Sequence, residues 1–312
     1  MRRAGTTRST LPTVAVLICL LAACGGAAQD PSASGDASPL AAGPLVVSAI
    51  PDQDPQELQR LHGSVAGYLE QRLDVPVEYV PVTDYNAAVS LFRTGDLDLV
   101  WFGGLTGVQA RLQTPGAQVI AQRDIDAEFH SVFIVNASTG LDPGDDVEDL
   151  DALRGLRFTF GSESSTSGRL MPQYFLDQAG VAEGDLAGAP GFSGSHDKTI
   201  DLVESGSFEA GVLNEQVWTS RVAAGDVDQD RVKLFLRTPG YHDYHWILGP
   251  SAAERYGEDF PDAVRAALLD LSPDDEQGAQ VLDLFGAESF IPAEASDYDQ
   301  IEQVARDLGL VR

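Results

Sequence analysis

The chain has 312 residues, of which 43% are hydrophobic, and a formal net charge of -28 at pH 7. At about 150 residues per domain, this length predicts two domains. So acidic a protein lacks the basic surface that nucleic acids require, which excludes them as partners. The same charge repels anions at long range, so any anion site must act at short range through directed hydrogen-bond donors.

The first 23 residues have the pattern of a secretory signal peptide. Three arginines precede a short apolar run, Thr13–Ala23. That run is about half as long as the roughly 20 residues of a membrane-spanning helix, so we expect the segment to be removed rather than kept as an anchor.

Cys24 follows the apolar run in the sequence Leu-Ala-Ala-Cys-Gly. This ending resembles the bacterial lipobox, and the resemblance implies that Cys24 becomes the acylated first residue of the mature protein. An ordinary signal peptide with an incidental cysteine is the alternative. The other cysteine, Cys19, lies inside the apolar run, so no disulfide is expected within the mature chain. Residues 24–43 are small and polar without periodicity, which predicts a flexible, lipid-anchored tether.

After Pro44, short β-rich runs alternate with amphipathic helical stretches, which is the pattern of an α/β fold. A helix is expected to begin at Pro55, because Asp54 is a favourable N-cap and proline suits the first helical turn. Further strands are expected at 45–50, 77–82, 97–102, 118–121 and 129–136, and helices at 85–93 and 105–112.

A second series of elements begins at Val147. We expect strands at 157–160, 209–213, 232–236 and 245–248, and helices at 168–178, 196–204, 215–224, 262–271, 276–285 and 297–308. Two α/β units with helices left over at the end predict a two-lobed clamshell in which the chain crosses twice, at 135–137 and 236–241. The expected lobes are therefore 44–135 plus 241–312, and 136–240.

The segment 161–168, GSESSTSG, lies between an expected strand and an expected helix. Such a turn combines free backbone N–H groups with several hydroxyls at the positive end of a helix. Charge-assisted hydrogen bonds of about 1.5–3 kcal/mol each would hold an anion there despite the acidic net charge. The alternative is a serine-rich loop with only a capping role. The turn lacks the lysine of a nucleotide phosphate loop.

Other strand-to-helix junctions lie near Tyr85, Phe102, His196 and Asn214. Ligands of open α/β sheets bind outside the C-terminal ends of strands, where all of these junctions fall. We therefore expect Tyr85 and His196 to contribute donors to the same site as the serine-rich turn. Ordinary helix-start and capping roles are the alternatives for these two residues.

Six segments between about residues 45 and 248 form a distinctive set: VPVTDYNAAV, LDLVWFGGLTG, FHSVFIVN, FTFGSESSTSG, GSHDKTIDLVESG and EAGVLN. Together they resemble the phosphate-, phosphite- and phosphonate-binding proteins of ABC importers. The resemblance implies a type II periplasmic-binding-protein fold, and a function as a membrane-anchored extracytoplasmic receptor that passes a small oxyanion to a permease and its ATPase. A monomer without enzymatic activity or cofactor is expected.

By the same resemblance, the ligand-binding positions are Tyr85, Ser165, Thr166, Ser167 and His196, with Trp101, Phe102 and Asn214 nearby. Some relatives hold an aminophosphonate with carboxylates, and those positions have no clear match in this chain. Asp197 and Glu215 are the nearest candidates.

Two segments, IPDQDP at 50–55 and AQRDIDAEFHSVF at 121–133, resemble a subgroup described as selenate importers. Selenate and sulfate are fully ionised at neutral pH and need only donors, whereas a protonated phosphate or phosphonate also benefits from an acceptor. A pocket of hydroxyls, amides and histidine suits both kinds of ligand. The oxyanion therefore stays open between selenate, sulfate, phosphate, phosphite and a phosphonate.

Metal import is an alternative function, because His130, His242 and His245 lie near the expected crossings. Residues three apart on an extended segment point to opposite faces, which disfavours His242 and His245 as joint ligands.

Hydrolysis is a further alternative, with Ser165 or Ser167 as nucleophile and His196 as base. The chain lacks the Gly-x-Ser-x-Gly elbow, and a serine-rich helix start suits anion binding better than activation of a hydroxyl.

Overall fold

The computed structural model describes residues 43–311. The expected signal peptide, the lipidation site Cys24 and all of the tether except Gly43 lie outside the described residues. No helix in the described range is long and apolar enough to cross a membrane.

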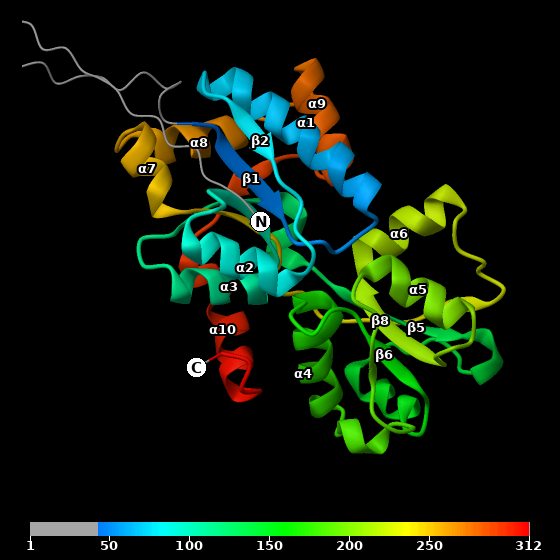
Figure 1. The fold of residues 1–312 in the computed structure, drawn as a ribbon. Coiled ribbons are helices and arrows are strands. Elements are labelled where there is room, and N and C mark those ends of the chain that lie inside the picture. Colours follow the sequence, from blue (N-terminus) through cyan, green and yellow to red (C-terminus); the bar gives the residue numbers. More distant parts are fainter. Residues whose placement is uncertain (1–42, 312) are drawn as a thin grey trace, which may run out of the picture. The chain divides into compact units, whose positions relative to one another are not determined.

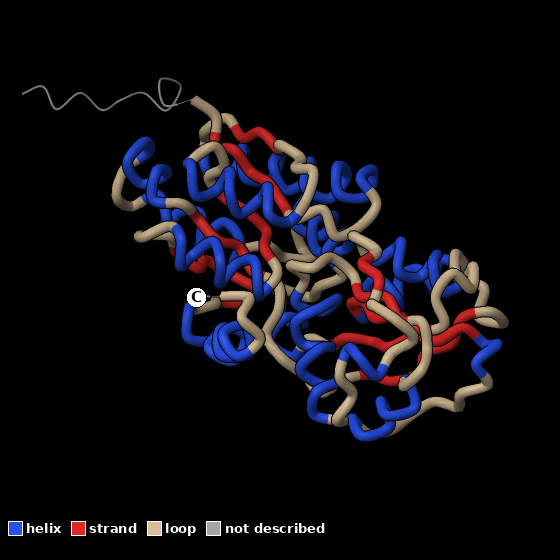
Figure 2. Tube along the Cα trace, turned by 60° about the horizontal axis from the view of Figure 1, so that its bottom comes forward, coloured by secondary structure: helices blue, strands red, loops and turns tan. Residues whose placement is uncertain are grey.

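The strands of residues 43–311 form two sheets (Figure 2). The first has the order β11 (Phe290–Pro292), β4 (Gln118–Arg123), β10 (His245–Leu248), β3 (Leu99–Phe102), β1 (Leu45–Ala49) and β2 (Val77–Tyr79). β1 is parallel to β2 and β3, whereas β10 is antiparallel to β3 and β4. This sheet is the centre of lobe 1.

The helices of lobe 1 come from both ends of the described chain. They are α1 (Pro55–Leu73), α2 (Tyr85–Thr94), α3 (Gly104–Gln113), α7 (Pro250–Tyr256), α8 (Phe260–Leu269), α9 (Glu276–Phe285) and α10 (Asp299–Asp307). Figure 1 shows α8 and α9 beside α1, and the Tyr68 hydroxyl of α1 donates to the Ala267 carbonyl of α8 at 2.7 Å. The chain therefore returns to its first lobe, as predicted.

Lobe 2 is built on the second sheet, in the order β7 (Gly191–Phe192), β6 (Phe158–Phe160), β8 (Ala210–Asn214), β5 (Ser131–Asn136) and β9 (Val232–Arg237). Its helices are α4 (Met171–Gln178), α5 (His196–Glu204) and α6 (Glu215–Ala224). A π-helical turn, Thr166–Leu170, leads directly into α4.

The first crossing between the lobes lies earlier than predicted. β5 pairs antiparallel with β8 and β9, so it belongs entirely to lobe 2, and the crossing is the segment 124–130. The predicted boundary at residue 135 is therefore wrong. Its cause is that 129–136 is apolar on both faces, as central strands are, and such a pattern does not show which sheet the strand joins. The second crossing is 238–244, which overlaps the predicted one.

Local sequence signals explain most helix starts. The Asp54 side chain accepts from the Gln56 backbone N–H at 2.8 Å and caps α1, as predicted. The expected ranges of α5, α6 and α9 agree with the structure. α7 and β11 were not expected, because α7 begins directly after Gly249 at Pro250 and β11 has only three residues, the last of them a proline.

The two crossings bring the strand ends of both lobes together. Ser131, the first residue of β5, stands opposite Asn214, the last residue of β8. In the same way His245 at the start of β10 stands opposite Phe102 at the end of β3. The strand that follows each crossing, β5 or β10, therefore starts at the edge of its sheet where the parallel strands end. The strand-to-helix junctions of both lobes lie at these edges and face one another.

Candidate functional site

Hydrogen bonds between strand-to-helix junctions join the lobes. The Leu105 N–H, at the start of α3, donates to the Thr166 Oγ1 atom of lobe 2 at 2.9 Å. The His196 N–H, at the start of α5, donates to the Asp52 carbonyl of lobe 1 at 2.9 Å. The serine-rich turn is thus part of the interface between the lobes.

The turn itself is a buried helix start. Ser165 caps it, because its Oγ accepts from the Gly168 N–H at 2.9 Å. Thr166 and Ser167, which are 2% and 1% exposed, occupy first-turn positions, where backbone N–H groups have no partner inside a helix. A Cβ on Gly168 would come within 3.0 Å of Ser165 Oγ and 3.3 Å of the His196 ring, so only glycine allows this close approach.

Asp243 of the second crossing also reaches the turn, and sequence reasoning missed it. Its Oδ1 accepts from the Gly104 N–H at 2.9 Å. A Cβ on Gly103 would lie 3.2 Å from that oxygen and 3.3 Å from Thr166 Oγ1, so the three residues meet at one point. Within residues 43–311, no lysine or arginine forms an ion pair with Asp243. A carboxyl group therefore lies among neutral donors.

Three buried polar atoms lie at this arrangement without a hydrogen bond of normal geometry to any described residue: Tyr85 Oη, Ser167 Oγ and Asp243 Oδ2. Ser165 is nevertheless close enough to lower the pKa of Tyr85, and Ser167 close enough to lower that of Asp243, so these contacts are near but not well aligned. Leaving such groups unsatisfied costs about 1–3 kcal/mol each, so they call for a bonding partner. Two hydroxyls and one carboxyl oxygen, beside helix N–H groups, suit a ligand that has several acceptor oxygens and one acidic proton.

The protonation states fit that interpretation. Burial raises the pKa of Asp243 from 3.8 to about 7, although the Gly104 N–H opposes this shift. Burial and the Asp52 carboxylate raise the pKa of Tyr85 well above its usual value, so its hydroxyl is a neutral donor. Burial lowers the pKa of His196 to about 3, so its ring is neutral.

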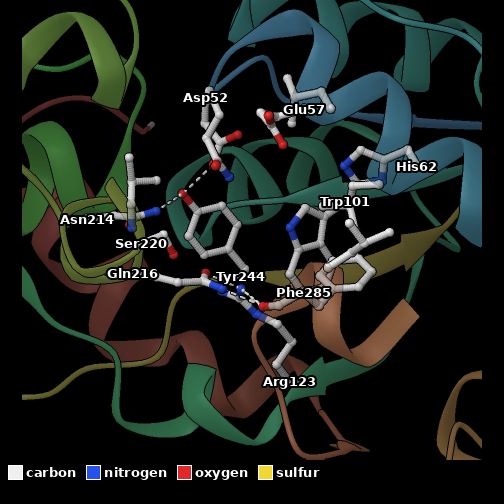
Figure 3. A pocket seen from close by; sticks show the side chains of 15 residues that line it. Asp52, Glu57, His62, Trp101, Arg123, Asn214, Gln216, Ser220, Tyr244 and Phe285 are labelled. Atoms are coloured by element: carbon white, nitrogen blue, oxygen red, sulfur yellow. Dashed lines mark hydrogen bonds between the residues drawn. The ribbon is translucent and has the colours of Figure 1, made fainter. Parts of the chain in front are cut away.

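A polar network adjoins the turn (Figure 3). The Tyr244 hydroxyl donates to Asp52 Oδ2 at 2.7 Å and accepts from Asn214 Nδ2 at 3.1 Å. His196 Nε2 lies 3.4 Å from the same hydroxyl. Burial raises the pKa of Asp52 to about 6, against the effects of Tyr244 and Arg123. The network connects lobe 1, the second crossing and lobe 2.

The predicted site residues separate into three groups. Tyr85, Ser165, Thr166 and Ser167 come together around Asp243, and His196 lies directly beside the turn. Trp101 and Asn214 instead line an adjacent cavity of about 140 Å³ between the lobes. Phe102 is fully buried against Phe92, with ring centroids 5.5 Å apart, so its ring is part of the core of lobe 1.

The two carboxylates considered for an amine have other partners. Asp197 pairs with Arg221 at 2.6 Å, and Glu215 pairs with Arg237. Asp197 lines a cleft of about 650 Å³ between the lobes, together with Tyr85 and Ser162. Because Ser162 belongs to the segment 161–168, the cleft borders the serine-rich segment.

The structure does not support the metal site. His130 Nδ1 bonds the Thr238 carbonyl at 2.7 Å, and His245 is stacked on Tyr298 with ring centroids 3.8 Å apart. The residues that the structure describes include no group of three or more His, Cys, Asp or Glu placed to hold a metal ion.

The hydrolase alternative also lacks its geometry. His196 Nδ1 faces the Asn214 N–H and Nε2 faces Tyr244, so within 43–311 no hydrogen bond joins His196 to Ser165 or Ser167. A serine activated by this histidine is not present.

Comparison with known proteins gives one matching family model and several similar proteins. A family model described as ABC transporter, phosphonate, periplasmic substrate-binding protein matches residues 47–298. The chain is 50% identical over 278 residues to a probable ABC transporter phosphite binding protein, PhnD1, of Prochlorococcus marinus, covering 88% of this chain and 94% of the relative. It is 26% identical to the phosphate-import protein PhnD of Mycolicibacterium smegmatis, over 73% of this chain and 72% of that protein.

Solved structures show the same fold. PhnD1 of Prochlorococcus marinus in complex with methylphosphonate has a TM-score of 0.85 and 49% identity, covering 86% of this chain and all of that one. A binding protein component of an ABC phosphonate transporter from Pseudomonas aeruginosa has a TM-score of 0.72 at 16% identity, covering 83% of this chain and 84% of that one. The predicted two-lobed type II periplasmic-binding-protein fold is confirmed.

The raised pKa of Asp243 predicts how stability depends on pH. The pKa is higher in the folded protein than the usual 3.8, so the stabilising effect of the bound proton is complete below pH 3.8 and is lost as pH rises through about 7. Asp243→Asn should therefore leave the melting temperature of ligand-free protein nearly unchanged at pH 4 and raise it by roughly 5 °C at pH 8. Thermal unfolding, monitored by circular dichroism, gives the melting temperatures at pH 4 and pH 8. A variant less stable than wild type at pH 8 would contradict the raised pKa of Asp243.

Proposed function

The chain belongs to the phosphonate family of periplasmic substrate-binding proteins of ABC transporters, and from this premise we propose that it binds a singly protonated phosphorus oxyanion, either phosphite or a small phosphonate. Proteins of this family are receptors and not enzymes. The observation that carries the proposal is the buried carboxyl group of Asp243, placed among the donors of the serine-rich turn.

A carboxyl group in an anion site selects between anions, because it favours those that carry an acidic proton over those that do not. Phosphite and phosphonates retain an acidic proton near neutral pH, and that proton makes a hydrogen bond between a ligand oxygen and Asp243 Oδ2. Selenate and sulfate have no such proton, so they bring two like charges together unless Asp243 is itself protonated. Because the pKa of Asp243 is about 7, the carboxyl group still favours ligands that supply the proton.

The name and the solved structure of one relative support a phosphorus ligand. That relative is named as a phosphite-binding protein, and its structure contains methylphosphonate. The segment 121–133, which resembles selenate importers, has a structural role: Arg123 and Asp126 form a buried ion pair in the first crossing, and the Arg123 guanidinium lies over the Phe129 ring. The likeness of this segment to selenate importers therefore does not indicate which anion the protein binds.

The proposed mechanism is closure of the two lobes over the anion. Lobe 1 supplies the Tyr85 hydroxyl and the α3 start, and lobe 2 supplies the Thr166 and Ser167 hydroxyls with their N–H groups. Closure removes water from these bonds, which strengthens them. The closed receptor then docks on the permease, whose ATPase drives transport.

Asp243→Asn tests the proton requirement. The amide cannot accept the ligand proton as a carboxylate does, so methylphosphonate affinity should fall about 10- to 100-fold at pH 7.5, the loss expected for one hydrogen bond between charged groups. Removing the charge should leave sulfate affinity unchanged or improved. Calorimetric titration of both ligands measures the ratio of affinities, and an equal loss for both ligands would refute the role of the carboxyl group.

Thr166→Val tests the turn. This variant loses a hydroxyl that accepts from the Leu105 N–H of the other lobe and that lies beside the Asp243 carboxyl group, so methylphosphonate should bind about 10-fold more weakly or worse. Thr159→Val is the matched control, because Thr159 is equally buried in β6 and its hydroxyl bonds only the neighbouring Phe160 carbonyl at 2.9 Å. Equal affinities of the two variants would speak against the site.

We further propose that Cys24 anchors the protein to the membrane through lipid; the support is the lipobox-like ending of the apolar run. In a bacterial host given labelled palmitate, the wild-type protein should carry label and sediment with membranes. Cys24→Ser should lose both properties, whereas Cys19→Ser, inside the apolar run, should keep them. Label that persists in Cys24→Ser would rule out this anchor.

A further inference from the structure

Arg123 is a buried basic residue at the junction of lobe 1 and the first crossing. It is the last residue of β4 and is 3% exposed. Its guanidinium forms a two-point ion pair with Asp126 of the same crossing, with Nε to Oδ2 at 2.6 Å and Nη2 to Oδ1 at 2.7 Å. A buried charge without a partner is strongly destabilising, so this pair fixes the guanidinium in place.

The remaining nitrogen of the guanidinium reaches both lobes. Nη1 donates to the Phe285 carbonyl at the end of α9 in lobe 1, at 2.9 Å, and to Gln216 Oε1 of α6 in lobe 2. Gln216 Nε2 donates back to the same Phe285 carbonyl. Figure 3 shows the side chains of Arg123 and Gln216 converging at this point. One side chain at the end of β4 thus contacts a helix of each lobe.

Arg123 also supports the second crossing. Its Cζ lies 5.2 Å from the ring centroid of Tyr244 and 5.4 Å from that of Trp101, and these two rings are stacked 5.7 Å apart. The backbone N–H of Asp243 donates to the Asp126 carbonyl at 3.1 Å. The position of Asp243 in the anion site therefore depends on the Arg123–Asp126 pair.

Apolar packing does not fill the interface beside this cluster. The cavity of about 140 Å³ lies here, between α1 of lobe 1 and α6 of lobe 2, and both Arg123 and Gln216 line it. Where side chains leave such a space, dispersion contacts between the lobes are fewer. The polar contact between Arg123 and Gln216 then contributes a larger share of what holds the lobes together at this point.

We infer that Arg123 is a positioning residue for anion binding, which joins the two crossings into one unit and, through Gln216, stabilises the closed arrangement of the lobes. It does not touch the ligand. The effect of Arg123 on ligand affinity rests on the proposed function, whereas its stabilisation of the closed lobes does not. If the ligand binds the closed state, its apparent affinity falls in proportion to the fraction of protein that is closed. Weakening the contact between Arg123 and Gln216 lowers that fraction and should therefore speed ligand release.

Gln216→Leu removes the lobe 2 partner and leaves the Arg123–Asp126 pair intact. Release of methylphosphonate, followed by stopped-flow tryptophan fluorescence, should become about tenfold faster, with an association rate changed less than about threefold. The ligand-free radius of gyration from small-angle X-ray scattering should increase, and the ligand-saturated value should equal that of wild type. Gln109→Leu is the matched control, because Gln109 also donates to a backbone carbonyl, that of Leu310, but only within lobe 1.

Arg123→Lys is the second variant. Lysine keeps the charge but not the planar fork that serves Asp126, Phe285 and Gln216 together, so the release rate should again increase. Release rates and ligand-free radii for Gln216→Leu equal to those of Gln109→Leu would overturn the inference. If wild type binds neither methylphosphonate nor phosphite, the proposed ligand class fails, and the ligand-free radii still decide whether Gln216 holds the lobes closed.

Discussion

Capture of an anion by so acidic a protein depends on hydrogen-bond donors that have no net charge. With a formal charge of -28, the surface does not attract an anion, but charges beyond about 8 Å are largely screened at physiological ionic strength. What remains is the local field of helix starts. The fold provides it by bringing the beginning of α3 and the serine-rich turn together, where Leu105 N–H and Thr166 Oγ1 are 2.9 Å apart.

The same constraint explains why a carboxyl group can lie in an anion site. Asp243 is buried and has no basic partner among residues 43–311, which destabilises its ionised form and raises its pKa to about 7. A group that is costly for folding near neutral pH becomes useful when the ligand supplies a proton. In the proposed site, stability and selectivity are thus connected through one side chain, and the backbone N–H of the same residue donates to the Asp126 carbonyl at 3.1 Å.

Sequence reasoning reached the two-lobed fold, and it proposed the serine-rich turn as the centre of the site, because both depend on local patterns. The run GSESSTSG between a strand and a helix, and Tyr85 at a helix start, have signatures that are visible without a structure. Asp243 was missed because its partner Gly104 is 139 residues away, and the segment around it was considered only for its histidines, His242 and His245. Phe102 was included because the family resemblance placed it near the ligand, whereas in the structure its ring packs inside lobe 1. The first crossing was misplaced because β5 is buried on both faces, and such a strand fits either sheet.

The central claim is that the site selects an oxyanion that brings a proton to Asp243. The most direct test is calorimetric titration of the wild-type protein at pH 8 with phosphite, methylphosphonate and selenate in turn. The account predicts that at least one of the two phosphorus ligands binds at least about tenfold more tightly than selenate, the difference expected for one charge-assisted hydrogen bond. Selenate binding as tight as that of both phosphorus ligands, or tighter, would contradict it.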